Sequence, residues 1–227
     1  MRLELIQGIQ IIIIAFLSYV PTVTISGWFE AWAAKKCGDD LPEQFGFLTL
    51  DPMAHFNIVG FGFLLIGKLF ADYLPMFKDI PGWGRYIPLS PSEHNSKAKV
   101  FFQFTARAIA HFVLLLTAFF TIVFLFKGSS LATFSSVLQP GSSFLDSLLA
   151  VLIFFYRQNF ILCVIYFVIG IFRSILFFYF PSFHLFSTEN VLWAVFILIV
   201  SVLIGSIIVE FILDGIITGL SYLFVAR

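Results

Sequence analysis

Charged residues are scarce in this chain of 227 residues, because 13 basic and 13 acidic side chains make up only 11% of it. A soluble domain carries about 25% charged residues, so a cytosolic domain, a coiled coil and a disordered chain are excluded. The formal net charge is zero, which excludes nucleic-acid binding as the main activity. Cysteine is also scarce: Cys37 and Cys163 are the two in the sequence, and their spacing fits neither a metal site nor a disulfide framework.

Hydrophobic residues, by contrast, make up 60% of the chain and gather in five long blocks. In hydrocarbon every backbone N–H needs a partner within its own segment, so blocks of this length predict helices. Runs such as Ile11–Ile14 lack the alternation of a β-barrel strand. We therefore predict an all-α polytopic membrane protein with short β-like or re-entrant loops, forming a single integral membrane domain over residues 1–227. The expected spans are residues 5–32, 53–71, 106–126, 148–180 and 190–212.

Near the N-terminus, Arg2 precedes an uncharged run from Leu5 to Phe29. This run is longer than the apolar region of a secretory signal, and it contains no small-residue cleavage site. We expect it to remain as a spanning helix. With five spans, six basic residues lie on the side of the N-terminus and four on the other, which favours a cytoplasmic N-terminus.

Three motifs follow one another along the chain. The first is Gly38-Asp39 with Gly46-Phe-Leu-Thr-Leu-Asp51-Pro52-Met-Ala-His55, the second is the loop Gly82–Pro91, and the third is Ala106-Arg107-Ala108-Ile109-Ala110-His111. In order and spacing this series resembles the small bacterial site-2 proteases, which are intramembrane zinc metallopeptidases. The resemblance covers roughly residues 10–190. It implies a site-2-protease-like fold in the bacterial inner membrane.

The same register places the family's zinc-binding and catalytic positions on unsuitable residues. Its H-E-x-x-H motif would fall on residues 26–30, so Ser26 and Glu30 replace the histidines and Gly27 replaces the water-activating glutamate. The third ligand, an aspartate in the family, would be Phe186. Catalytic zinc needs three protein ligands, and its bound water needs a base nearby. Since only Glu30 could coordinate, we expect no catalytic residue and no zinc cofactor.

Charged residues within apolar blocks are the other informative feature. At mid-bilayer such a charge costs about 2.5–3.5 kcal/mol, so it normally faces a partner or a cavity. We expect Glu30 to form a structural ion pair, with Arg173 as its first candidate partner and Arg107 as its second. A weaker alternative is a rebuilt metal site formed by Glu30, His111 and His184, although no H-x-x-x-H spacing supports it.

The function expected from this resemblance is that of a pseudoprotease, which would bind or scaffold another membrane protein or a peptide within the lipid bilayer. Adding a strand to an exposed edge needs no metal, so recognition can persist without cleavage. One alternative is an active zinc metalloprotease with displaced ligands, and another is a small transporter or channel lined by the buried charges. The residues expected to bind the partner lie in a strand-like segment, Phe45–Leu50, and in the second loop: Phe45, Leu48, Leu50, Trp83, Arg85 and Pro88.

Overall fold

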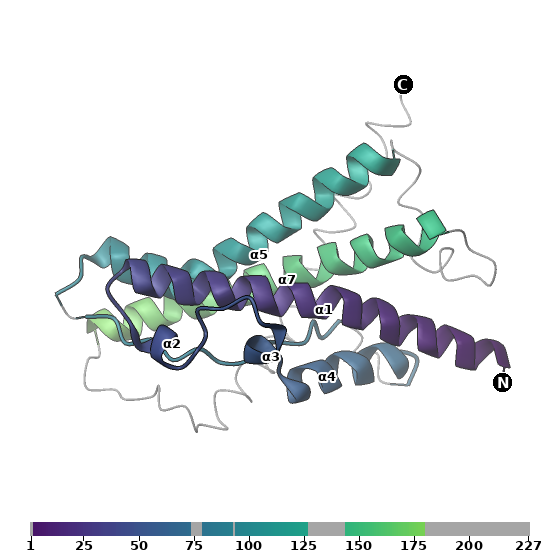
Figure 1. Ribbon diagram of the computed structural model, residues 1–227, viewed down its shortest axis with the longest axis horizontal. Helices are drawn as coiled ribbons and strands as arrows, with labels where there is room; N and C mark the ends of the chain where they lie inside the picture. Colours follow the sequence, from purple (N-terminus) through teal and green to yellow (C-terminus); the bar gives the residue numbers. More distant parts are fainter. Residues whose placement is uncertain (1, 74–78, 93, 127–143, 180–227) are drawn as a thin grey trace.

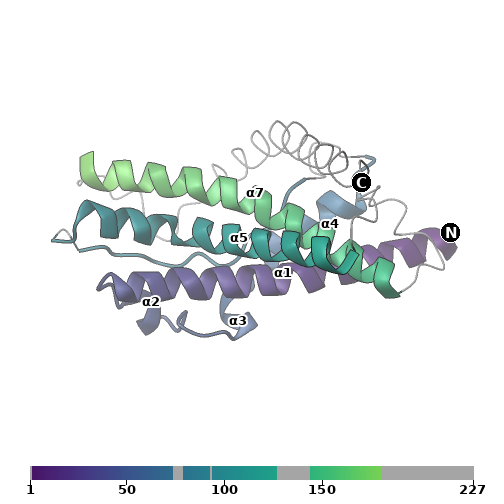
Figure 2. The same ribbon diagram turned by 90° about the horizontal axis from the view of Figure 1, so that it is seen from above.

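The regular elements of the described residues are all helices, as the sequence predicts. The computed structural model describes residues 2–73, 79–92, 94–126 and 144–179, and no strand is present among them. Three long helices lie side by side over much of their length, and three short ones lie against the first of them (Figures 1 and 2). The elements are α1 (Arg2–Lys36), α2 (Leu41–Gln44), α3 (Pro52–His55), α4 (Ile58–Leu69), α5 (Lys97–Phe126) and α7 (Phe144–Tyr179).

The long helices α1, α5 and α7 correspond to three of the predicted spans. They contain 35, 30 and 36 residues, and at 1.5 Å per residue each exceeds the roughly 30 Å of a bilayer's hydrocarbon core. By length and composition, these three of the described helices could cross a membrane. This is compatible with an integral membrane protein. The expected fifth span, residues 190–212, lies outside the described residues.

The second predicted span, residues 53–71, is divided into α3 and α4 instead of forming one helix. The side chain of Asn57 accepts hydrogen bonds from the backbone N–H groups of Val59 and Gly60, so a new helix begins after it. The resulting α4 has 12 residues, or about 18 Å, and is too short to cross the hydrocarbon core. The prediction of a single helix over residues 53–71 is therefore wrong, because apolar content alone does not reveal the N-cap at Asn57.

The segment Phe45–Leu50 is a turn, and the expected strand is absent from it. Gly46 adopts a left-handed backbone conformation with φ of +79°, which reverses the chain after α2. Phe47 is thereby directed inward, where it packs against Ala31 of α1 and Ile87. The other expected binding loop belongs to residues 79–92, an irregular segment that runs lengthwise between α1 and α5 (Figure 2).

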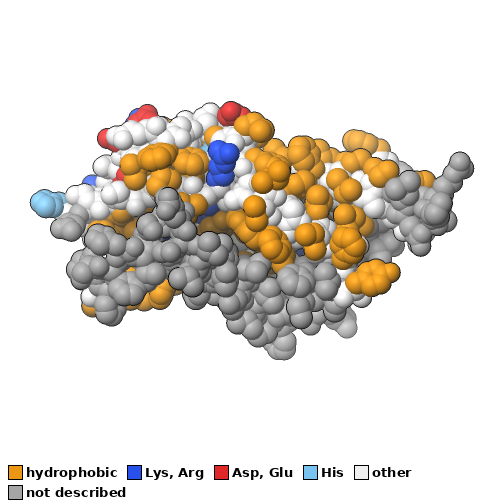
Figure 3. Space-filling view, turned by 90° about the horizontal axis from the view of Figure 1, so that it is seen from below, with side chains coloured by type: hydrophobic (Ala, Val, Ile, Leu, Met, Phe, Trp, Pro, Cys, Tyr) orange, Lys and Arg blue, Asp and Glu red, His pale blue; other side chains and the backbone are white. Residues whose placement is uncertain are grey.

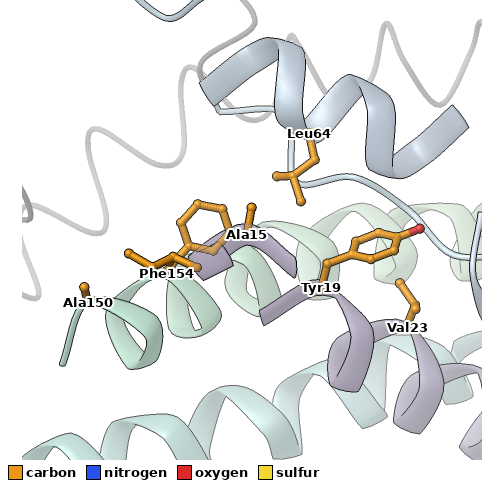
Figure 4. Close-up of a cluster of buried hydrophobic side chains, with 7 residues drawn as sticks. Ala15, Tyr19, Val23, Leu64, Ala150 and Phe154 are labelled. Atoms are coloured by element: carbon orange, nitrogen blue, oxygen red, sulfur yellow. The ribbon is translucent and has the colours of Figure 1, made fainter. Parts of the chain in front are cut away.

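The apolar core joins residues 14–23 of α1 to α4 and α7. Figure 4 shows Leu64 of α4 and Phe154 of α7 beside Ala15, Tyr19 and Val23 of α1. The Tyr19 hydroxyl lies 2.9 Å from the carbonyl oxygen of Asn57 and 2.8 Å from that of Trp83. A single buried side chain of α1 therefore holds both the start of α4 and residues 79–92 in place.

Gly60 should not tolerate a side chain, because α4 passes very close to the backbone of Trp83. A Cβ atom on Gly60 would lie 2.1 Å from the Trp83 carbonyl oxygen. Gly60→Ala should therefore destabilise the protein by about 1–3 kcal/mol, as overpacking does, in thermal unfolding in detergent. The matched control is Gly62→Ala on the same helix, where a Cβ meets nothing within 4 Å. Equal melting temperatures for the two variants would contradict this packing.

A buried charge cluster as the candidate functional site

Glu30 is the centre of a buried charge cluster that links the three long helices. Its side chain belongs to α1, and the residue is only 4% exposed. Its Oε2 lies 2.7 Å from Nε of Arg107 on α5, and its Oε1 lies 3.9 Å from Nη1 of Arg173 on α7. The Nε–H of Arg107 is not directed at the oxygen, so this contact is an ion pair without an aligned hydrogen bond. Both arginines expected from the sequence lie at Glu30, but Arg107 is the closer one.

The same arginines also hold residues 79–92 against the helices. Arg107 donates hydrogen bonds from Nη2 to the carbonyl oxygen of Arg85 at 3.0 Å and from Nη1 to the Tyr166 hydroxyl at 3.2 Å. Arg173 donates from Nη2 to the Tyr86 hydroxyl at 3.5 Å. Its guanidinium group also lies 4.7 Å from the centre of the Phe104 ring, within cation–π distance. The cluster therefore fixes both the helix bundle and this segment.

The space beside Gly27 is filled by His55 of α3. A Cβ atom on Gly27 would lie 2.3 Å from Nδ1 of His55. Nε2 of His55 lies 2.8 Å from the carbonyl oxygen of Thr49, so Nε2 carries the hydrogen and Nδ1 faces Gly27 without one. Burial lowers the pKa of His55, and the neutral ring is therefore favoured. The Ser26 hydroxyl is also buried, and its contact is with the Val23 carbonyl oxygen of its own helix.

The residues of the alternative metal site are engaged elsewhere or are not described. Nδ1 of His111 lies 2.9 Å from Oδ1 of Asn159, whose Nδ2 donates to the Thr22 hydroxyl at 3.0 Å. Within the described ranges, no three His, Cys, Asp or Glu side chains are grouped so that they could hold a metal ion. His184 lies outside those ranges, and so does Phe186, where the family resemblance would place the third ligand.

The two expected binding loops meet on the second half of α1. Phe47 of the first loop and Ile87 of the second are buried together against Ala31. The backbone N–H of Arg85 donates to the carbonyl oxygen of His55 at 2.8 Å, which joins the second loop to the end of α3. Of the predicted binding residues, Phe45, Leu50 and Arg85 are exposed, whereas Leu48, Trp83 and Pro88 are partly buried. The structure therefore brings the two predicted loops into contact with each other.

Asp39 is a structural anchor whose role the sequence motifs do not reveal. Its buried carboxylate accepts hydrogen bonds from the backbone N–H groups of Leu41 at 3.1 Å and Ser90 at 2.6 Å, and from Nε2 of Gln103. It therefore connects the end of α1, the second loop and α5. The sequence signal was weak, because an aspartate after a helix-ending glycine such as Gly38 is common in exposed turns.

The surface beside α2–α4 is more hydrophobic at one end of the molecule than at the other. In Figure 3 hydrophobic side chains are densest in the half toward the N-terminus, and the charged side chains in view lie mostly in the other half. Glu30 lies six residues, or about 9 Å, from the C-terminal end of α1, so the cluster belongs to the more polar end.

No protein-family model, curated protein or solved structure matches this chain.

Proposed function

We propose that this protein is a catalytically inactive, site-2-protease-like membrane protein that binds an extended segment of another membrane protein without cleaving it. The observation that carries the proposal is the position of the two loops. They meet beside a cluster in which Glu30, at the position of a family metal ligand, is paired with Arg107 and Arg173. In this proposal the ion pairs take over the role of the metal as a cross-link between helices.

The lack of catalysis follows from the groups around Glu30. A metal ion would compete with the guanidinium groups for the carboxylate, and each guanidinium would repel it. Gly27 supplies no base, and His55 occupies the space into which a longer side chain would extend. Activation of a water molecule by zinc requires both the metal and such a base. The residues around Glu30 favour neither the binding of zinc nor the deprotonation of a water molecule.

The capacity to bind an extended segment follows from the backbone of the second loop. Within the described residues, the backbone N–H groups of Tyr86, Ile87 and Leu89 make no hydrogen bond. In β-strand addition an extended segment binds through unpaired backbone N–H and C=O groups, and the second loop supplies such N–H groups. The exposed side chains of Phe45 and Leu50 on the neighbouring loop supply apolar surface for the side chains of such a strand.

Replacing Leu48 by proline should weaken partner binding. The variant is first checked for normal folding by its melting temperature, because the Leu48 side chain packs against the cluster of Ala31, Phe47 and Ile87. The backbone N–H of Leu48 makes no hydrogen bond among the described residues, so proline removes a donor that only a partner would use. To measure binding, a photo-crosslinking amino acid is placed at the exposed Leu50 in native membranes. Leu48→Pro should lower the yield of crosslinked membrane protein about fivefold, which corresponds to one hydrogen bond of about 1 kcal/mol.

The matched control places the same photo-crosslinker at Phe124, which is exposed near the far end of α5 (Figure 1). Its crosslinks should be the same with and without Leu48→Pro. The partner captured at Leu50 should have the same mass before and after incubation, because it is not cleaved. An unchanged yield at Leu50 in the Leu48→Pro variant would argue against binding at these loops.

A further inference from the structure

Arg85 of the second loop carries a positive charge that is not paired with any carboxylate of the described residues. Its side chain is exposed, and it forms no ion pair and no side-chain hydrogen bond within the described ranges. Arg107, Arg157 and Arg173, by contrast, have a carboxylate oxygen at 2.7, 3.4 and 3.9 Å respectively. A cation in a membrane protein normally faces a counter-charge or water, so the Arg85 guanidinium is open to a bound partner.

The Arg85 side chain also lies close to the first loop. Burial is the main cause that lowers the pKa of His55, and the positive charges of Arg107 and Arg85 lower it further, so both arginines are near its ring. The His55 ring is in turn bonded to the Thr49 carbonyl oxygen of the first loop. The carboxylate of Asp51 acts on His55 in the opposite sense, but it caps α3 and is not paired with Arg85. The Arg85 charge therefore lies where the two loops meet.

The backbone around Arg85 limits where a bound strand would run. The N–H of Arg85 donates to the His55 carbonyl oxygen, and the Arg85 carbonyl oxygen accepts from Nη2 of Arg107, so the backbone is held at this residue. The N–H groups of Tyr86 and Ile87, which make no hydrogen bond among the described residues, follow directly. A strand added at these groups would bring one of its side chains beside Arg85, at the separation of a cross-strand pair.

We propose that the partner segment carries an acidic side chain, aspartate or glutamate, opposite Arg85. This inference rests on the proposed function, because it names the chemistry of the segment that the two loops would bind. An opposite-charge cross-strand pair stabilises a sheet, whereas a basic side chain at the same place would be repelled. A guanidinium group can also bind a carboxylate through two N–H groups at once. The exposed side chains of Phe45 and Leu50 would contact apolar residues of the same segment.

A lipid phosphate would also pair with Arg85 by charge alone, but the neighbouring groups favour a peptide. The unpaired N–H groups of Tyr86 and Ile87 match the repeating carbonyl oxygens of a peptide backbone. A segment bound to them would hold its carboxylate beside Arg85 without further ordering of the loop. The occupant is therefore an acidic peptide segment.

The test measures the binding of short labelled peptides to the full-length protein in a mild detergent by fluorescence anisotropy. The peptides alternate valine and threonine and differ only at one central residue, which is glutamate, glutamine or lysine. The glutamate peptide should bind about fivefold more tightly than the glutamine peptide. This factor corresponds to about 1 kcal/mol, the upper end for an accessible ion pair. The lysine peptide should bind most weakly.

Arg85→Gln should reduce the affinity of the glutamate peptide to that of the glutamine peptide, and Arg85→Glu should reverse the preference in favour of the lysine peptide. Because the Arg85 side chain has no partner among the described residues, both variants should keep the melting temperature of the wild type. The control for lost charge is Lys97→Gln, on an exposed residue at the start of α5, which should keep the fivefold preference.

The possible failures of the test are distinguishable. Equal binding of the glutamate and glutamine peptides to the wild type would overturn the acidic preference and leave the proposed function standing. If none of the peptides binds, binding at these loops fails and the inference fails with it. A preference that persists in Arg85→Gln would place the carboxylate elsewhere. Loss of the preference when phosphatidylglycerol is added to the micelles would assign Arg85 to a lipid phosphate instead.

Discussion

Replacing Glu30 by leucine should destabilise the protein by about 3–5 kcal/mol, because it leaves two buried guanidinium groups without their carboxylate. For a chain of this size, that corresponds to a fall in melting temperature of roughly 2–4 °C per kcal/mol. Arg107→Leu should have a smaller effect, since Arg173 remains 3.9 Å from Glu30. The measurement is thermal unfolding in detergent, in which all variants are compared at the same pH and salt concentration.

The double variant Glu30→Leu/Arg107→Leu separates pairing from a general loss of packing. Its loss of stability should be smaller than the sum of the losses in the two single variants. The reason is that both members of the Glu30–Arg107 pair are removed together, so neither is left buried without its partner. The coupling free energy between Glu30 and Arg107 should exceed that between Glu30 and Arg173, because the N···O distance is 2.7 Å in the first pair and 3.9 Å in the second. Additive effects for both arginines would show that these charges do not interact.

An exposed ion pair provides the matched control for this cycle. Lys35 on α1 pairs with Glu43 on α2, and both side chains are 43% exposed. Exposed pairs contribute about 0–1 kcal/mol, so Glu43→Leu should change the stability only slightly. A loss comparable to that of Glu30→Leu would mean that burial is not the reason for the large effect.

The second large effect is expected at Gly27, where even one added methyl group should lower stability. In Gly27→Ala the Cβ would lie 2.3 Å from Nδ1 of His55. The ring cannot turn aside freely, because it is bonded to the Thr49 carbonyl oxygen and packs beside Phe47. Overpacking of this kind costs about 1–3 kcal/mol. The measurement is again the melting temperature in detergent.

Gly8→Ala on the same helix is the control, since a Cβ there meets only the side chain of Leu69, at 4.0 Å. It should be neutral or slightly stabilising, because alanine is the better helix former. Adding His55→Ala should reduce the loss caused by Gly27→Ala. If His55→Ala gives no such relief, the imidazole is not what fills this space.

The contact between Gly27 and His55 also affects any attempt to build an H-E-x-x-H motif into α1. Changing Ser26, Gly27 and Glu30 to His, Glu and His would place a carboxylate side chain where the His55 ring now lies. It would also remove the partner of Arg107 and Arg173. We therefore expect the triple variant to be unstable, and His55→Ala to relieve only the steric part of that instability.

The buried charges were the most informative part of the sequence. The long uncharged run before Glu30 indicated that this carboxylate needs a partner, and the arginines within later blocks were the natural candidates. Which arginine lies closer could not be predicted, because it depends on how α5 and α7 are rotated about their axes. A rotation of one residue turns a side chain by about 100°, and loop motifs carry no information about it.

The short elements around the cluster were predicted less well, for reasons that are local. Apolar residues on both sides of Asn57 concealed a helix start, and Gly46 forms a turn within the segment that was predicted to be strand-like. The contacts of Asp39 and His55 join parts of the chain that are distant in sequence, so no local pattern reports them. The positions at 184 and 186, on which the metal hypothesis partly rests, are not among the described residues.

The zinc content of the purified protein tests most directly whether charge, not metal, links α1 to α5 and α7 at Glu30. The protein is purified without chelators, incubated with zinc, freed of excess metal and measured by elemental analysis beside Glu30→Ala. We expect far less than one zinc per chain in both samples, with no difference between them. About one zinc per chain in the wild type that is lost in Glu30→Ala would contradict the ion-pair cluster and indicate a metal site at this position.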